Sequence, residues 1–164
     1  MFLSASTIHR PPLFIGLYYP QALKARMTKI EYSPTIYPLH IDAMGHVNNI
    51  VYVQWMEIGR VRLLEAVELP IEQITQVGFG PALVATTIRY KTPLYLGDRV
   101  SATIWLSQLR GASATMQFEF FNQAGELSAR GEQRGLFIDL QSKRPKRLDS
   151  EMRSRFGQYL IELG

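Results

Sequence analysis

One short stretch of the chain holds most of the residues that could do chemistry. It runs Asp42-Ala-Met-Gly45-His46-Val-Asn48-Asn49, and an amphipathic helical pattern begins directly after it. The first N–H groups of a helix have no partner inside the helix, so they can polarise a carbonyl oxygen. A carboxylate just before a helix start is therefore a plausible catalytic arrangement, with Asp42 as the reacting group.

The elements that must position this stretch follow a simple order. A strand is predicted before it and a long helix after it, capped by Asn48, and four further strands alternate apolar with polar residues. A short helix before those strands and a C-terminal helix complete the pattern. The predicted ranges are 29–37 (strand), 50–67 (helix), 71–77 (short helix), strands over 82–91, 100–106, 114–120 and 127–140 with a hairpin turn at 122–125, and 149–163 (helix).

Two faces of the long helix are predicted from the spacing of its residues. One carries Ile50, Val53, Glu57, Val61 and Leu64, and the adjoining face carries Trp55, Ile58 and Arg62. One long helix after the first strand of an antiparallel sheet must cover a sheet face. The predicted fold is α+β: a hotdog fold, with a five-stranded antiparallel sheet wrapped around one long central helix.

Composition excludes several classes of protein. The 164 residues contain no cysteine, which excludes disulfides, thiolate metal sites and a cysteine nucleophile, and fits a cytoplasmic location. The three histidines are too scattered for a metal site, so we expect no metal and no cofactor. The apolar run 13–19 is too short to cross a bilayer, so no membrane association is expected.

The net charge of +4 is unevenly distributed. Residues 1–27 carry +3 and no acid, so the folded body is nearly neutral and no nucleic-acid partner is expected. A local basic cluster, Lys143, Arg144, Lys146 and Arg147, surrounds Pro145 in a predicted turn. It is a solvated loop or a phosphate-binding patch.

The domain organisation has three parts. Residues 1–27 are predicted to be an N-terminal extension, either disordered or a mis-assigned start upstream of Met27. Residues 28–148 form the hotdog domain, and 149–164 the C-terminal helix.

Two motifs resemble a known family. Asp42-x-x-Gly45-His46-Val47-Asn48-Asn49-x-x-Tyr52, followed by Glu57 and Arg60, resembles the acyl-CoA thioesterases of the 4-hydroxybenzoyl-CoA thioesterase type. The later run from Ile88 to Asp98, Ile-Arg-Tyr-Lys-x-Pro-Leu-x-x-Gly-Asp, resembles the second strand and turn of that family. The resemblance covers about residues 28–148.

The resemblance implies roles for individual residues. The carboxylate of Asp42 attacks the thioester carbonyl or activates a water, and the backbone N–H of Asn49 hydrogen-bonds the thioester oxygen. His46 is a weaker catalytic candidate that more often orients such a loop. Gly45 shapes the loop.

The resemblance also implies a site shared between subunits. Two sheets join edge to edge in a homodimer or homotetramer, and the partner supplies basic residues for the phosphates of coenzyme A. The substrate-binding candidates are Tyr52, Pro81, Arg110, Ser113, Arg89 and Lys91, with 143–147 as a further source of positive charge.

Several of these residues have a simpler explanation. Asp42 could cap the helix or stabilise a turn, and Tyr52, Trp55 and Met56 could be plain core. Glu57 lies where a second hotdog lineage places its catalytic carboxylate, but an intrahelical pair with Arg60 or a contact across the dimer explains it more simply.

The predicted function is an acyl-CoA thioesterase, which hydrolyses an acyl- or aryl-CoA thioester to the free acid and coenzyme A. An acyl carrier protein thioester is a second candidate substrate. Two alternatives stay open: a non-catalytic acyl-CoA-binding or assembly module on the same scaffold, and a hotdog dehydratase or hydratase, whose motifs this chain does not match.

Overall fold

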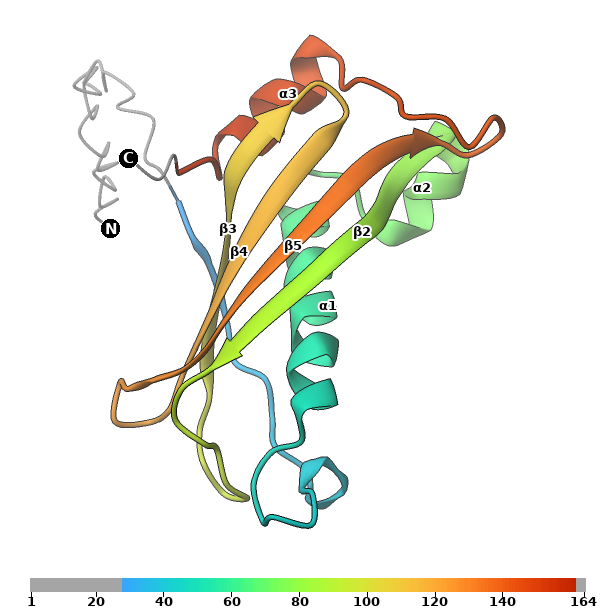
Figure 1. The fold of residues 1–164 in the computed structure, drawn as a ribbon. Helices are drawn as coiled ribbons and strands as arrows, with labels where there is room; N and C mark the ends of the chain where they lie inside the picture. Colours follow the sequence, from blue (N-terminus) through green and yellow to red (C-terminus); the bar gives the residue numbers. More distant parts are fainter. Residues whose placement is uncertain (1–27, 162–164) are drawn as a thin grey trace, which may run out of the picture.

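The computed structural model describes residues 28–161, so the predicted N-terminal extension and residues 162–164 lie outside the described residues. The chain begins with a short strand, continues through the long helix, and then builds the rest of the sheet (Figure 1). The elements are β1 (Ile30–Tyr32), the 3₁₀ turn η1 (Pro38–His40), α1 (Asn49–Ala66), α2 (Ile71–Val77), β2 (Phe79–Tyr90), β3 (Ser101–Arg110), β4 (Ser113–Phe121), β5 (Leu127–Asp139) and α3 (Ser150–Gly157).

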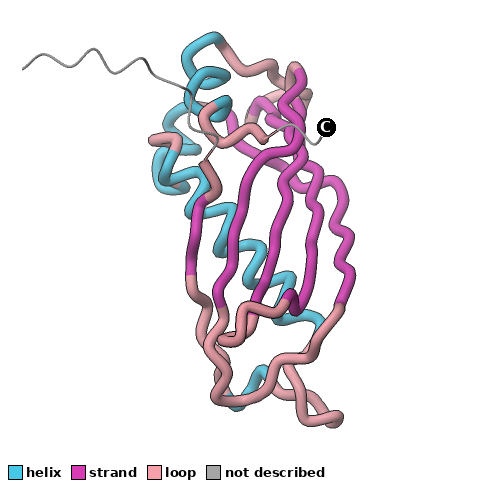
Figure 2. The backbone as a smooth tube through the Cα atoms, turned by 90° about the vertical axis from the view of Figure 1, so that its left-hand side faces the viewer, coloured by secondary structure: helices cyan, strands magenta, loops and turns pink. Residues whose placement is uncertain are grey.

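The five strands form one antiparallel sheet in the order β1-β3-β4-β5-β2. The sheet curves around α1, and α1 lies against one face of the sheet (Figures 1 and 2). This arrangement confirms the predicted α+β architecture. The two longest strands, β5 and β2, pair with each other at one side of the sheet. Because β2 is the last strand in the order and pairs with no further strand among the described residues, it is an edge strand of 12 residues.

The core lies between α1 and the inner face of the sheet. The buried residues of α1 are Val51, Tyr52, Trp55, Met56, Gly59, Leu63 and Leu64, which recur at helical spacing. They pack on inner-face residues of β3 and β4 that alternate as predicted: Ala102, Ile104, Leu106, Ala114, Met116, Phe118 and Phe120. Gly59 lets α1 lie close to β1 and β4. A Cβ at this position would lie 2.7 Å from the Tyr32 hydroxyl of β1 and 3.0 Å from Phe118 Cε1 of β4.

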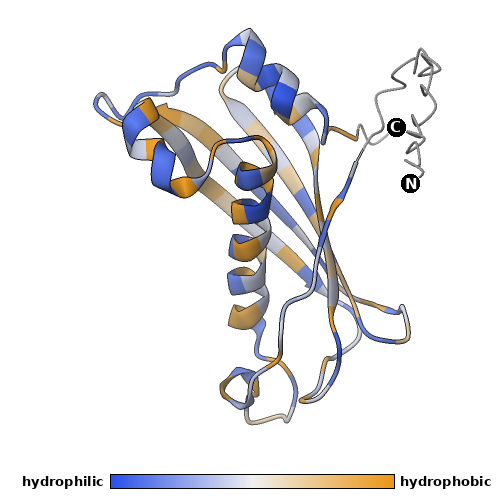
Figure 3. Cartoon of the chain, turned by 180° about the vertical axis from the view of Figure 1, so that it is seen from behind, coloured by the Kyte–Doolittle hydropathy of each residue, from blue (hydrophilic) through white to orange (hydrophobic). Residues whose placement is uncertain are grey.

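The predicted faces of the long helix match the buried surface only in part, since Leu64 and Trp55 are buried. Ile50, Val53 and Ile58 are exposed rather than buried. Figure 3, in which α1 lies in front of the sheet, shows hydrophobic residues along the side of α1 turned away from the sheet. Apolar residues occur all around this helix, so spacing alone selects no unique face.

Two predicted elements are shorter than expected. The first strand ends at Tyr32 instead of reaching residue 37, because the buried Pro34 cannot donate to the β3 ladder and η1 follows. Helix α3 ends at Gly157, because the next residues hydrogen-bond to β3 through Leu106 instead (2.8 Å from Leu106 N to Tyr159 O and from Ile161 N to Leu106 O).

Candidate active site

The loop before α1 is a small hairpin that fixes the position of Asp42. An isolated antiparallel bridge joins Ile41 and Val47, and Asp42 N donates to His46 O at 3.0 Å. Gly45 closes the turn by donating its N–H to Asp42 O at 3.0 Å, and it has φ +81°, a conformation that favours glycine. Gly45 therefore shapes the loop.

The Asp42 carboxylate makes contacts within the protein through both of its oxygens, but only one of them accepts a backbone hydrogen bond from the described residues. Oδ1 accepts the Met44 N–H at 2.8 Å, and Oδ2 lies 3.5 Å from His46 Nδ1. The Asp42 side chain is 24% exposed and that of His46 is 35% exposed, so both reach solvent. One carboxylate oxygen holds the turn, and the other faces the imidazole, on a side chain that solvent reaches.

The start of α1 provides the second part of the candidate site. Asn48 caps the helix as predicted, because its side-chain oxygen accepts the Ile50 N–H at 3.0 Å. Within residues 28–161 no hydrogen bond uses the Asn49 N–H as its donor. An 18-residue helix adds its dipole at this end, so the free N–H lies in a positive field.

The second sequence motif holds the first in place. The Val47 N–H donates to the buried Leu94 O at 2.8 Å, and the Tyr90 hydroxyl donates to Asn49 O at 3.2 Å. Neither Tyr90 nor Leu94 is among the site residues predicted from the sequence. Their membership of the second motif was the available signal, and their contact with the first motif explains why both motifs occur together.

An aromatic cluster lies beneath the start of α1. Tyr52 is 2% exposed, packs edge-on against Trp55, Tyr90 and Phe120, and shares a hydrogen bond with Ser128 Oγ at 3.1 Å. Burial raises the pKa of Tyr52, and so does the neighbouring Tyr90, while the Ser128 hydrogen bond lowers it. Burial also raises the pKa of Tyr90. Tyr52 is thus a core residue in the protomer, and its predicted substrate contact stays a prediction.

The predicted basic contacts are not gathered around Asp42 in one protomer. Arg89 and Lys91 are exposed at the site end of β2, on either side of Tyr90, and so point away from the helix face. Arg110 and Ser113 lie in the β3–β4 hairpin at the opposite end of the sheet (Figure 1). The substrate contact of Arg110 and Ser113, which the family resemblance assigns to a partner subunit, stays a prediction.

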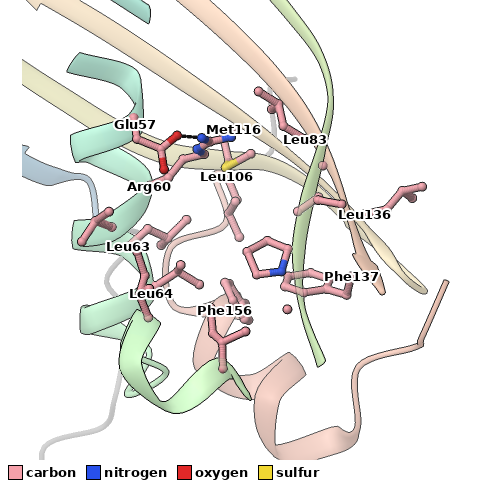
Figure 4. Close-up of a pocket in the computed structure, with 18 of the residues that line it drawn as sticks. Glu57, Arg60, Leu63, Leu64, Leu83, Leu106, Met116, Leu136, Phe137 and Phe156 are labelled. Carbon is pink, nitrogen blue, oxygen red and sulfur yellow. Dashed lines mark ion pairs between the residues drawn. The ribbon is translucent and has the colours of Figure 1, made fainter. Parts of the chain in front are cut away.

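An apolar cavity of about 270 Å³ lies between the second half of α1, α2 and the sheet (Figure 4). Its lining includes Leu63, Leu64, Met116, Phe137 and Phe156, together with the predicted Pro81. Its lining begins at Glu57, eight residues after Asn49, which is about 12 Å along the helix.

The charged residues of this cavity are Glu57 and Arg60, which form the predicted intrahelical ion pair (Figure 4). Burial lowers the pKa of the Arg60 guanidinium, which remains cationic. The Glu57 carboxylate is thus engaged with Arg60.

No group of three His, Asp or Glu side chains in residues 28–161 could hold a metal ion. No helix in the same part of the chain is both long enough and apolar enough to cross a membrane.

Known proteins resemble this chain over most of the described residues. The family model of the thioesterase-like superfamily matches residues 37–156. YneP of Bacillus subtilis (strain 168), named as a candidate acyl-CoA thioesterase, is 29% identical over 104 residues, which are 63% of this chain and 75% of YneP. The chloroplastic acyl-acyl carrier protein thioesterase ATL3 of Arabidopsis thaliana is 30% identical over 127 residues, which are 73% of this chain but only 63% of ATL3.

A solved structure shares the fold. Slr0204 of Synechocystis, a 1,4-dihydroxy-2-naphthoyl-CoA thioesterase, superposes with a TM-score of 0.72 at 20% identity, covering 79% of this chain and 96% of its own. The likeness confirms the predicted hotdog fold.

Proposed function

Because the chain belongs to the thioesterase-like superfamily, we propose that it hydrolyses acyl thioesters with Asp42 as the catalytic carboxylate. The chain is a thioester hydrolase, the class of enzyme to which its named relatives belong. The acyl group is carried by coenzyme A or by an acyl carrier protein, whose thioester is the second candidate substrate.

The proposed reaction is hydrolysis by water, and it uses Asp42 and the start of α1 without a metal or cofactor. In the first route, Asp42 takes a proton from water as the water oxygen attacks the thioester carbonyl, and the C–S bond of the resulting intermediate breaks. In the second route, the carboxylate attacks the carbonyl directly, the C–S bond breaks to leave an acyl-Asp42 anhydride, and water then hydrolyses that anhydride. The negative charge that develops on the carbonyl oxygen is stabilised by the Asn49 N–H and the α1 dipole. In both routes the thiolate leaves as the C–S bond breaks, and it takes its proton from the protonated Asp42 in the first route and from solvent in the second.

The unpartnered Asn49 N–H beside the Asp42 hairpin carries this proposal. A carboxylate in a loop is common, but a rigid loop that ends at a free helix N–H supplies both attack and oxyanion stabilisation. His46, 3.5 Å from Asp42 Oδ2, orients the carboxylate in this scheme.

The apolar cavity supports an apolar acyl group. Apart from Glu57 and Arg60, the named lining residues are aliphatic or aromatic, and the volume is close to the lower end of ligand pockets, about 300 Å³. We assign this cavity to the acyl chain.

The proposal includes a homodimer formed through β2. Among the described residues, one edge of this 12-residue strand pairs with no other strand, and Leu83, Val84 and Tyr90 along it are exposed. An exposed apolar edge is a template for pairing with another chain. Antiparallel pairing about the middle of β2 would bring the partner's cavity, and the hairpin with Arg110 and Ser113, toward Asp42.

Hydrolysis itself is tested with the purified full chain. Acyl-CoAs of increasing length and an aryl-CoA are incubated with the protein, and free thiol is measured with a chromogenic reagent. We expect thiol release with at least one of them. Tight binding of acyl-CoA without thiol release would replace the proposal with the non-catalytic acyl-binding alternative.

The acyl cavity predicts a change in chain-length preference. Ala114 is buried, lines the cavity from β4 and faces α1, so Ala114→Leu fills part of it. We expect kcat/KM for the longest acyl-CoAs to fall about tenfold relative to short ones. The matched control is Ala66→Leu, at an exposed position outside the cavity. An equal change for all chain lengths would argue against the assignment.

A further inference from the structure

The loop that follows β5 carries four cations close together in the sequence. Lys143, Arg144, Lys146 and Arg147 are all exposed, and none forms an ion pair within the described residues. Other arginines of the fold, such as Arg62 and Arg130, pair with glutamates. Figure 3 shows the same loop as largely hydrophilic.

The acids nearest in sequence are already engaged by the protein. Asp139 accepts hydrogen bonds from Ser142 N (2.7 Å) and Oγ (2.9 Å) and from Gln141 N (3.1 Å). These hydrogen bonds lower the pKa of Asp139 below its usual value, and the bond from Ser142 N has the largest effect. The charge of Lys146 lowers this pKa further. Asp149 caps α3, and Glu151 pairs with Arg155. The loop therefore presents a net positive surface.

This loop is held in a defined shape. Asp139 N donates to Arg144 O at 2.9 Å, Lys146 N donates to Phe137 O at 2.8 Å, and Pro145 forms a bridge with Ile138. Lys143 has φ +59°, a conformation that costs energy for any residue other than glycine or asparagine.

In the proposed dimer, the basic loop of one subunit lies next to the active site of the other. Phe79, the first residue of β2, pairs with Asp139, and the Lys146 ammonium lies 5.1 Å from the Phe79 ring centre. Tyr90, the last residue of β2, contacts Asn49 at the catalytic loop. Antiparallel pairing of two β2 strands about their middle sets Phe79 of one subunit beside Tyr90 of the other, so each basic loop borders the partner's Asp42 site.

We propose that this basic loop, residues 143–147, is the docking surface for an acidic carrier protein that delivers the acyl thioester. The inference rests on the proposed function and names the protein partner of that same site. The four exposed cations follow one another along a loop that extends past α2 (Figure 1), and they do not line the acyl cavity. An extended row of charge matches a broad anionic protein surface better than the compact phosphates of coenzyme A.

The test compares two substrates with the same acyl chain, one on coenzyme A and one on a purified acidic acyl carrier protein. The variant Arg144→Glu/Arg147→Glu reverses two charges in the loop. The matched control, Arg62→Glu/Arg134→Glu, makes the same change in net charge at exposed positions of α1 and β5. Initial rates are measured at low and high salt.

We expect the loop variant to lose about tenfold or more in kcat/KM with the carrier-protein substrate and less than about twofold with the acyl-CoA. High salt should reduce the wild-type rate on the carrier substrate, because exposed charges are screened. The control variant should behave as wild type.

Three outcomes of the comparison between variants would overturn the docking surface. They are equal losses with both substrates, which would make the loop a phosphate site, no loss with either, and an equal loss in the control variant. A wild-type protein that hydrolyses acyl-CoA but not the carrier thioester would also overturn it. Each of these leaves the proposed hydrolase intact, whereas failure to hydrolyse any thioester would overturn the proposed function itself.

Discussion

Asp42→Asn should lower kcat for thioester hydrolysis by about 10³-fold or more, because an amide can neither accept a proton from water nor attack a carbonyl. Asp42→Ala should show a loss of the same order. The measurement is thiol release under saturating acyl-CoA, compared with wild type.

The structure makes Asp42→Asn the cleaner of the two variants. The asparagine Oδ1 can still accept the Met44 N–H, so the hairpin before α1 keeps its shape. Thermal unfolding should therefore match wild type for Asn, which separates lost chemistry from lost fold. Near-normal turnover in both variants would show that Asp42 is only a turn residue.

Asn49→Pro is expected to lower kcat by about 10²–10³-fold, the usual effect of removing one oxyanion donor. Proline lacks the N–H assigned to the thioester oxygen. It is well tolerated at the first position of a helix, where that N–H has no intrahelical partner. The preceding Asn48 already has φ −61° and ψ 142°, the extended conformation that a residue before proline prefers.

Asn49→Ala is the matched control because it removes the side chain and keeps the backbone N–H. It should retain most of the wild-type turnover. Equal activity losses in the alanine and proline variants would assign the role to the side chain instead. Full activity in the proline variant, with an unchanged unfolding temperature, would remove Asn49 from the mechanism.

The elements around the site could be predicted because their signals are local. Asn48 before an apolar helical run predicts a helix start, and the structure confirms its cap. Alternation predicts the inner face of β4, and the Asn122–Gly125 turn is closed by a 3.0 Å hydrogen bond from Gly125 N to Asn122 O. Each signal involves residues a few positions apart, so backbone geometry alone decides the outcome.

The faces of α1 could not be predicted for the opposite reason. Ile50, Val53 and Ile58 are as apolar as Val51, Trp55 and Met56, yet only the second set is buried. Which side packs depends on where the sheet lies, and that is set by strand pairings distant in sequence. The same dependence hid the cavity, whose lining joins α1 to α2, β2, β5 and α3.

By itself the sequence determined the order of the elements, the loop-to-helix junction at Asp42–Asn49 and the family resemblance, because periodicity, caps and motifs depend on neighbouring residues. Only the tertiary structure decided that Tyr90 and Leu94 hold that junction, that Tyr52 belongs to the core, and that Arg110 and Ser113 lie at the far end of the sheet. Those facts follow from which strands pair and how α1 packs on them. Such contacts join residues separated by tens of positions, and only the pairing of the strands and the packing of the core bring them together.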